Sequence, residues 1–145
     1  MRGDDGVGWL VATRLIERRG EKAWEVGFLH QLVPELADDF GQFDVVVLVD
    51  ASAEQPPGSI RICELQLPSG AESKTLTHHL NPARLLGLAL ELHGRVPREF
   101  LISIGGKDFG FSEELSPAVK QAAEKATRYI ESLLHLLEQG WLDCR

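Results

Sequence analysis

The stretch from Phe43 to Asp50, FDVVVLVD, decides how the rest of the sequence is interpreted. Its run of consecutive apolar residues, most of them β-branched, is too short for a helix with a polar face. A run without alternation is typical of a strand that is covered on both faces, as in a parallel α/β sheet. Ligands of open α/β sheets bind outside the carboxyl ends of such strands, where Asp50 lies. Asp50 is therefore a candidate site residue, although an aspartate here also commonly begins a turn.

Helix and strand patterns alternate on both sides of this stretch. Apolar spacing and end signals predict helices at 7–19, 34–40, 82–93 and 116–137, and further strands at 24–30, 59–67 and 99–104. The clearest end signals are Asn81 before Pro82, which cap and open a helix, and Gly94, which closes it. This order predicts an α/β fold, a three-layer sandwich in which a twisted, mostly parallel sheet carries helices on both faces.

Composition limits the class of protein. A chain of 145 residues with 43% hydrophobic and 26% charged residues indicates a single globular domain over residues 1–145. The net charge of −7 disfavours binding to nucleic acid or to an anionic membrane surface. No apolar run approaches the roughly 20 residues that span a bilayer. Cys63 and Cys144 fit neither a zinc knuckle nor a disulfide framework, so we expect a reducing, cytoplasmic location.

Two loops carry groups that could join Asp50. Asp4 and Asp5 lie between glycines in GDDG at 3–6, where they either approach a ligand or cap the following helix. His78 and His79 lie in THHLNP at 77–82, where a histidine is otherwise a solvated surface group. Two carboxylates and one neutral imidazole would make a mixed oxygen and nitrogen site suited to a borderline divalent metal.

Other chemistries lack support in the sequence. The serines have no GxSxG context, which disfavours a serine hydrolase triad. The GlyGly pair at 105–106 lacks the lysine and hydroxyl residue of a phosphate-binding loop and the spacing of a dinucleotide fingerprint. Nucleotide binding is therefore disfavoured.

Five motifs occur in an order that resembles one protein family. They are RGDDGVG at 2–8, HQLVPEL at 30–36, VVLVDA at 46–51, THHLNP at 77–82, and DF at 108–109 followed by EELSPAV at 113–119. Each motif is loose alone, but together they resemble the maturation endopeptidases of nickel–iron hydrogenases across nearly the whole chain. The resemblance implies an α/β fold and a peptidase that removes a C-terminal extension from the precursor of the hydrogenase large subunit.

The resemblance also implies a set of site residues. The metal-contacting residues of the family fall by motif on Asp5, Asp50 and His78, with Asp4 and His79 as lesser candidates. The nickel arrives with the substrate and serves as the recognition element, and no organic cofactor is implied. Asp5 and Asp50 either activate water as general bases or only bind the metal. Segments 68–77 and 107–113 are the expected substrate-facing loops.

The start of the sequence departs from the family pattern. Family members begin with an apolar strand and a GlyAsn pair ahead of the part matched by RGDDG at 2–6, and this sequence starts after both. We therefore expect a gap or an exchanged strand in the sheet, so that a stable protein would need dimerisation, strand exchange or residues upstream of Met1. Two alternatives to the peptidase remain open, namely a zinc-dependent hydrolase using the same Asp/Asp/His residues and a non-catalytic chaperone that senses nickel loading.

Overall fold

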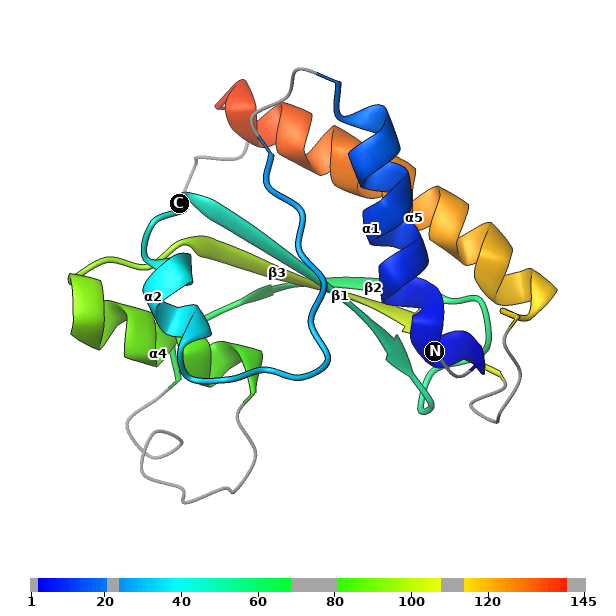
Figure 1. Ribbon diagram of the computed structural model, residues 1–145, viewed down its shortest axis with the longest axis horizontal. Coiled ribbons are helices and arrows are strands. Elements are labelled where there is room, and N and C mark those ends of the chain that lie inside the picture. Colours follow the sequence, from blue (N-terminus) through cyan, green and yellow to red (C-terminus); the bar gives the residue numbers. More distant parts are fainter. Residues whose placement is uncertain (1–2, 21–23, 69–80, 108–113, 141–145) are drawn as a thin grey trace. The chain divides into compact units, whose positions relative to one another are not determined.

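The computed structural model describes residues 3–20, 24–68, 81–107 and 114–140, with the backbone alone for Asp4 and Asp5. Its helices and strands follow the order that the sequence predicts, except that the described residues form no strand between the first two α-helices (Figure 1). In chain order they are η1 (Gly3–Gly6), α1 (Val7–Arg18), α2 (Leu36–Phe40), β1 (Val45–Ser52), β2 (Ile60–Leu65), α4 (Pro82–His93), β3 (Arg98–Gly105) and α5 (Pro117–Glu138). Among these described helices, none is both long and apolar enough to cross a membrane.

The three described strands form one sheet in the order β1-β3-β2. Strands β1 and β3 run parallel, because Arg98 N donates to Asp44 O at 2.9 Å and Gly106 N donates to Ser52 O at the same distance. The two bonds advance by the same number of residues along both strands, as a parallel register requires.

Strand β2 pairs with β3 in the opposite direction. Gly105 N donates to Ser59 O at 2.8 Å at one end, and the Arg98 guanidinium binds the Glu64 carboxylate at the other. The predicted α/β class is confirmed, and the described sheet is mixed, with one parallel and one antiparallel pairing. The strand predicted at 59–67 is confirmed at residues 60–65, where β2 lies at the edge of the described sheet and shows three exposed residues in a row.

Strand β1 is less enclosed than its apolar run predicts. Seven of its eight residues are half-buried and Asp50 is exposed, whereas β3 has five buried residues. The physical reason is position: β3 has a strand on each side, and β1 has β3 as its one neighbour among the described strands. Residues 45–49 are half-buried on both faces, so the expected cover is present only in part.

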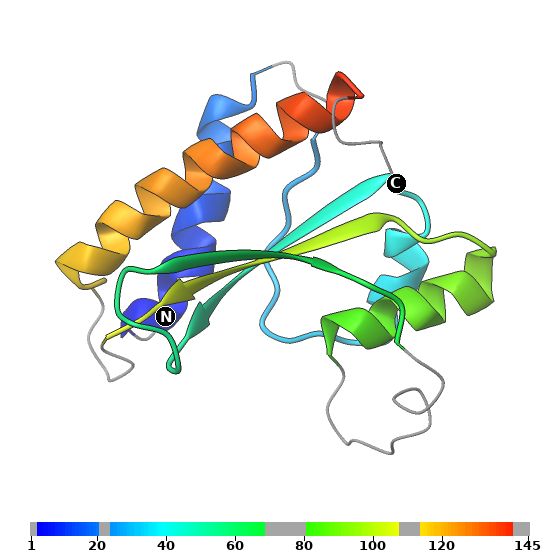
Figure 2. The same ribbon diagram turned by 180° about the vertical axis from the view of Figure 1, so that it is seen from behind.

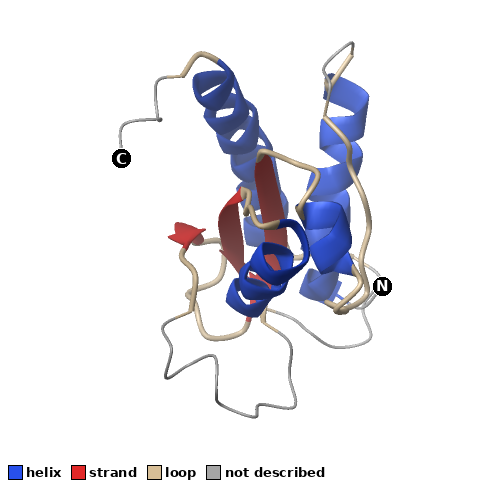
Figure 3. Cartoon of the chain, turned by 90° about the vertical axis from the view of Figure 1, so that its left-hand side faces the viewer, coloured by secondary structure: helices blue, strands red, loops and turns tan. Residues whose placement is uncertain are grey.

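The predicted strand at 24–30 is also wrong. The structure has no regular element at 24–30, and Figure 3 draws the described residues that lead into α2 as a loop. A strand needs a hydrogen-bonding neighbour, and no strand of the described sheet pairs with this segment. The segment instead contacts α1 through a side chain: the ring centroids of Phe28 and Trp9 lie 4.8 Å apart.

The chain divides into two compact units, which are described separately. The first unit comprises Met1–Phe28, Val49–Arg61 and Ile102–Arg145. In it α1 packs along α5, as Figures 1 and 2 both show. The apolar face predicted for the first helix is buried at Val7, Val11 and Leu15. It belongs to a core that also contains Ile102 and Ile104 of β3 and Val119, Ala122, Ala123, Ala126 and Ile130 of α5.

The second unit comprises Leu29–Leu48 and Ile62–Leu101. In it α2 packs on α4, and Ala37, Phe40, Leu85 and Ala89 form the centre of an apolar cluster. The ends of α4 are those predicted: the Asn81 side chain accepts a hydrogen bond from Arg84 N, and Gly94 ends the helix with a φ of 70°. Helix α2 is shorter than predicted, because residues 34–35 form a turn before it.

Candidate functional site at the carboxyl end of β1

Asp50 lies near the carboxyl end of β1, in the first unit. Its side chain is exposed, and Oδ1 accepts a hydrogen bond of 2.8 Å from the backbone N of Ala51. Among the described residues, none forms a hydrogen bond with the second carboxylate oxygen, Oδ2. An exposed carboxylate with one oxygen anchored and the other available is well placed to bind a cation or a water molecule.

The N-terminal turn approaches the same end of β1. A Cβ atom added at Gly8 would lie 2.8 Å from the carbonyl oxygen of Val49, so the backbones of α1 and β1 are in direct contact there. Gly8 follows η1, which contains Asp4 and Asp5, and Val49 precedes Asp50. Gly8 of the N-terminal motif therefore has a packing role. The close contact that it allows brings the acidic turn to the strand that carries Asp50.

The loop that follows Asp50 is held by a side chain that the sequence analysis missed. Gln55 is buried and its Nε2 donates to Ser103 O at 3.2 Å and to Ser59 Oγ at 3.3 Å. Figure 2 shows this loop turning back from the end of β1 into β2. Nothing in the local sequence indicates the bond to Ser103, because that residue lies 48 positions further along the chain.

The other predicted site residues are placed only in part. Asp5 and Asp4 belong to η1, and their side chains are not described. His78 and His79 lie outside the described residues. The two predicted substrate-facing loops lie outside them as well, except for residue 68 of the first and residue 107 of the second. Within residues 3–20, 24–68, 81–107 and 114–140, no three His, Cys, Asp or Glu side chains are grouped so as to hold a metal ion.

Glu99, in the second unit, is a further ionisable group that the sequence analysis did not single out. Its side chain is fully buried in β3, and neither carboxylate oxygen has a hydrogen-bond partner in the described part of the chain. Burial raises the pKa of Glu99 from 4.5 to about 8, because desolvation penalises the charged form. The neutral carboxylic acid is therefore favoured over the carboxylate near pH 7.

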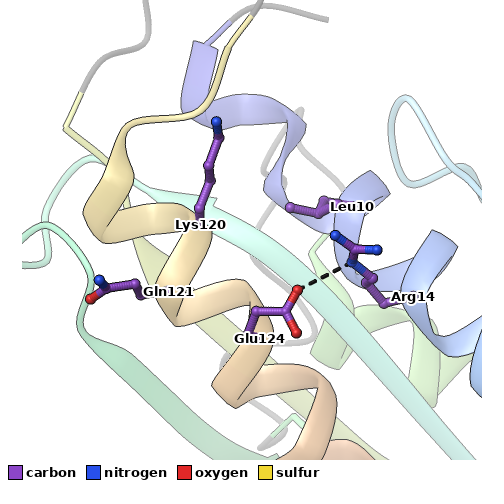
Figure 4. A pocket seen from close by; sticks show the side chains of 5 residues that line it. All are labelled: Leu10, Arg14, Lys120, Gln121 and Glu124. Atoms are coloured by element: carbon purple, nitrogen blue, oxygen red, sulfur yellow. Dashed lines mark ion pairs between the residues drawn. The ribbon is translucent and has the colours of Figure 1, made fainter.

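A surface cavity of about 430 Å³ opens between α1 and α5 and contains none of the predicted site residues. Its lining consists of Leu10, Arg14, Lys120, Gln121 and Glu124. Figure 4 shows Arg14 and Glu124 pointing toward one another, with Nε and Oε1 3.2 Å apart. Both side chains are about half exposed, so this pair contributes little to stability. The cavity is a groove between two packed helices, and the candidate site remains at the end of β1.

Comparison with solved structures identifies similar folds. The hydrogenase maturation protease HycI from Thermococcus kodakarensis KOD1 is 27% identical, with a TM-score of 0.70 over 92% of this chain and 85% of that chain. The hydrogenase maturating endopeptidase HybD from E. coli is 22% identical, with a TM-score of 0.69 over 96% of this chain and 87% of that chain. HybD from Thermococcus kodakarensis is 24% identical, with a TM-score of 0.65 over 92% and 91%.

No protein-family model and no curated protein sequence matches the chain. The structural agreement therefore extends beyond what sequence comparison detects. The chain is a structural match to the [NiFe] hydrogenase maturation proteases over more than 90% of its length, which confirms the resemblance.

Proposed function

We propose that this protein is an endopeptidase that removes the C-terminal extension from the nickel-loaded precursor of a [NiFe] hydrogenase large subunit in the cytoplasm. The observation that carries the proposal is the match to a [NiFe] hydrogenase maturation protease at 27% identity and a TM-score of 0.70. The presence of an exposed Asp50 at the carboxyl end of β1 supports it. The predicted three-layer arrangement of sheet and helices is part of the same proposal.

The proposed site consists of Asp5, Asp50 and His78, which contact the nickel carried by the substrate. Two carboxylates and an imidazole form the mixed donor set that a borderline divalent metal accepts. The contact between Gly8 and the Val49 carbonyl supports the inclusion of Asp5, because it brings η1 to the strand that bears Asp50. The inclusion of His78 rests on its place in the THHLNP motif at 77–82.

The proposed reaction is hydrolysis of one peptide bond. A water molecule adds to the scissile carbonyl carbon, the C–N bond breaks, and a proton passes to the leaving amine. The nickel ion of the substrate would polarise the carbonyl. Asp50 or Asp5 would accept the proton from the attacking water as general base. This assignment gives the two aspartates a catalytic role in addition to metal contact.

The test is processing of a purified precursor in vitro. We expect the wild-type protein to shorten nickel-loaded precursor, and mass spectrometry to detect the released C-terminal peptide, whereas precursor without nickel stays intact. Asp50→Asn should abolish processing, because an amide keeps the shape of the carboxylate but loses its charge. Asp39→Asn is the matched control at another exposed aspartate and should leave processing unchanged.

Two results would contradict the proposal. Precursor that binds and is never shortened would indicate the nickel-sensing chaperone. Purified protein with a stoichiometric, tightly bound zinc ion, and no requirement for nickel in its substrate, would indicate the zinc-dependent hydrolase.

A further inference from the structure

The loop between Asp50 and β2 is fixed to the end of β3 by one buried amide side chain. Gln55 is 8% exposed, and its Nε2 donates to Ser103 O and Ser59 Oγ. Ser59 Oγ in turn donates to Pro56 O at 2.6 Å. A buried amide that lost these partners would leave polar atoms unsatisfied, which destabilises a folded state. The three groups therefore form a small network that holds the middle of the loop.

Backbone hydrogen bonds hold the two ends of the same loop. At its start, Ser52 O accepts from Gly106 N at 2.9 Å, and Ser52 Oγ accepts from Glu54 N at 3.2 Å. At its end, Gly58 N donates to Gly105 O at 2.8 Å. Gly105 is required there, because a Cβ atom at this position would lie 2.0 Å from the carbonyl oxygen of Pro56.

The register of the sheet relates this network to Asp50. The carbonyls of Asp44 and Ser52 accept from Arg98 and Gly106, so the parallel register places Ser103 beside Asp50 on the neighbouring strand. Gln55 therefore bonds to the backbone directly next to the residue that carries the candidate carboxylate. Among the residues that the structure describes, Ala51 N is the group that anchors the Asp50 side chain, so the direction of this side chain depends on the conformation of the backbone that follows it.

We propose that Gln55 is a positioning residue for Asp50: by fixing the loop after β1 onto the end of β3, it sets the direction of the Asp50 carboxylate. This inference rests on the proposed function. Gln55 is buried and directed at Ser103, so its effect on the reaction is exerted through the backbone at Ala51 and Ser52 and not through contact with the substrate.

Gln55→Glu and Gln55→Leu test the inference. Gln55→Glu keeps the size of the side chain, but a carboxylate cannot donate to Ser103 O. Gln55→Leu removes both hydrogen bonds and keeps the volume filled. We expect either variant to lower kcat for precursor processing by about 10–100-fold, as for other groups that orient a ligand, with KM little changed. The matched control is Gln121→Leu at an exposed position of α5, which should keep wild-type kcat.

A second readout is independent of catalysis. Hydrogen exchange of the Ala51, Gly58 and Gly106 amides should accelerate by at least about tenfold in Gln55→Leu, while amides in the middle of α5 keep their protection. Unchanged exchange at these three amides would overturn the inference even if the wild-type protein processed no precursor. Wild-type kcat in both Gln55 variants would overturn it while leaving the proposed function intact.

Discussion

Among the described acidic residues, Glu99 has the environment that departs furthest from that of a typical carboxylate. It is fully buried, its pKa is raised to about 8 by desolvation, and it has no hydrogen-bond partner among the described residues. Between its ordinary pKa of 4.5 and about 8, the unfolded chain releases a proton that the folded chain keeps. The free energy of unfolding therefore falls as the pH rises through this range, by up to about 1.4 kcal/mol for each pH unit from this residue.

Glu99→Gln removes this titration and should flatten the pH dependence. We expect the difference in unfolding free energy between variant and wild type to increase in favour of the variant from about pH 5 to about pH 8, measured by urea unfolding. Glu91→Gln, at an exposed position of α4, is the control, and its curve should stay parallel to the wild-type curve. A parallel curve for Glu99→Gln would contradict the prediction.

The adjacent histidines give a second prediction at the level of one residue. Neighbouring residues of an extended segment point in roughly opposite directions, so one imidazole of the pair should face the two aspartates. The motif assigns this role to His78. We expect His78→Ala to abolish processing of nickel-loaded precursor, as Asp50→Asn does, and His79→Ala to retain most of it. An inactive His79→Ala variant would reverse the assignment, and two active variants would indicate a mechanism that depends on the carboxylates alone.

Two helical glycines differ in the space around them, which tests how α1 is held against β1. At Gly8 an added Cβ would meet the Val49 carbonyl at 2.8 Å, whereas at Gly87 in α4 the nearest atom is Pro68 Cδ at 4.0 Å. Gly87→Ala should stabilise the protein by about 0.5–1 kcal/mol, because alanine favours the helix. Gly8→Ala should destabilise it by about 1–3 kcal/mol, because backbone atoms must shift.

Comparing Gly8→Ala with Gly87→Ala separates the effect of close packing between α1 and β1 from the effect of helix propensity on stability. Thermal unfolding gives the sign of each change, and precursor processing shows whether the shift at Gly8 also moves the acidic turn. We expect Gly8→Ala to lower processing and Gly87→Ala to leave it unchanged. Equal stabilisation by both substitutions would mean that α1 does not contact Val49 as closely as the structure indicates.

Elements defined by local signals could be predicted from the sequence, and elements defined by distant partners could not. Helix α4 begins at Pro82 and ends at His93 as predicted, because Asn81 and Gly94 fix its ends within one turn. The segment at 24–30 has the alternation of a strand and forms none, because pairing depends on a neighbour elsewhere in the chain. The enclosure of β1 was overestimated for the same reason.

The candidate site shows the same division. Asp50 could be predicted from its place after an apolar run, and its position at the carboxyl end of β1 follows from the chain direction alone. The contribution of Gln55 could not, because its acceptor at Ser103 is brought close only by the pairing of β1 with β3. The buried Glu99 was likewise hidden, since its sequence neighbours Arg98 and Phe100 give no sign that the carboxyl group lacks a partner.

The edge of the sheet at β1 leads to a prediction for the molecule as a whole. Asp44 O and Ser52 O are directed at β3, so by the alternation of a strand the backbone groups of Val45 and Val47 are directed away from it, as is the Val49 carbonyl, which packs against Gly8 of α1. Residues 45–52 contain no proline or lysine of the kind that protects an edge strand. No strand of the described sheet pairs with this edge at Val45 and Val47, and we expect a second copy of this protein to pair there.

Light scattering after gel filtration should then report a dimer at micromolar concentration, and Tm should rise with protein concentration, because association stabilises the folded state by mass action. Val47→Lys places a charge on the β1 edge and should raise the dimer dissociation constant by at least about tenfold. Ile62→Lys on the β2 edge, where the side chain is already 46% exposed, is the matched control and should leave it unchanged. A monomer with a concentration-independent Tm would contradict the prediction, and a dimer lost only in Ile62→Lys would move the interface to β2.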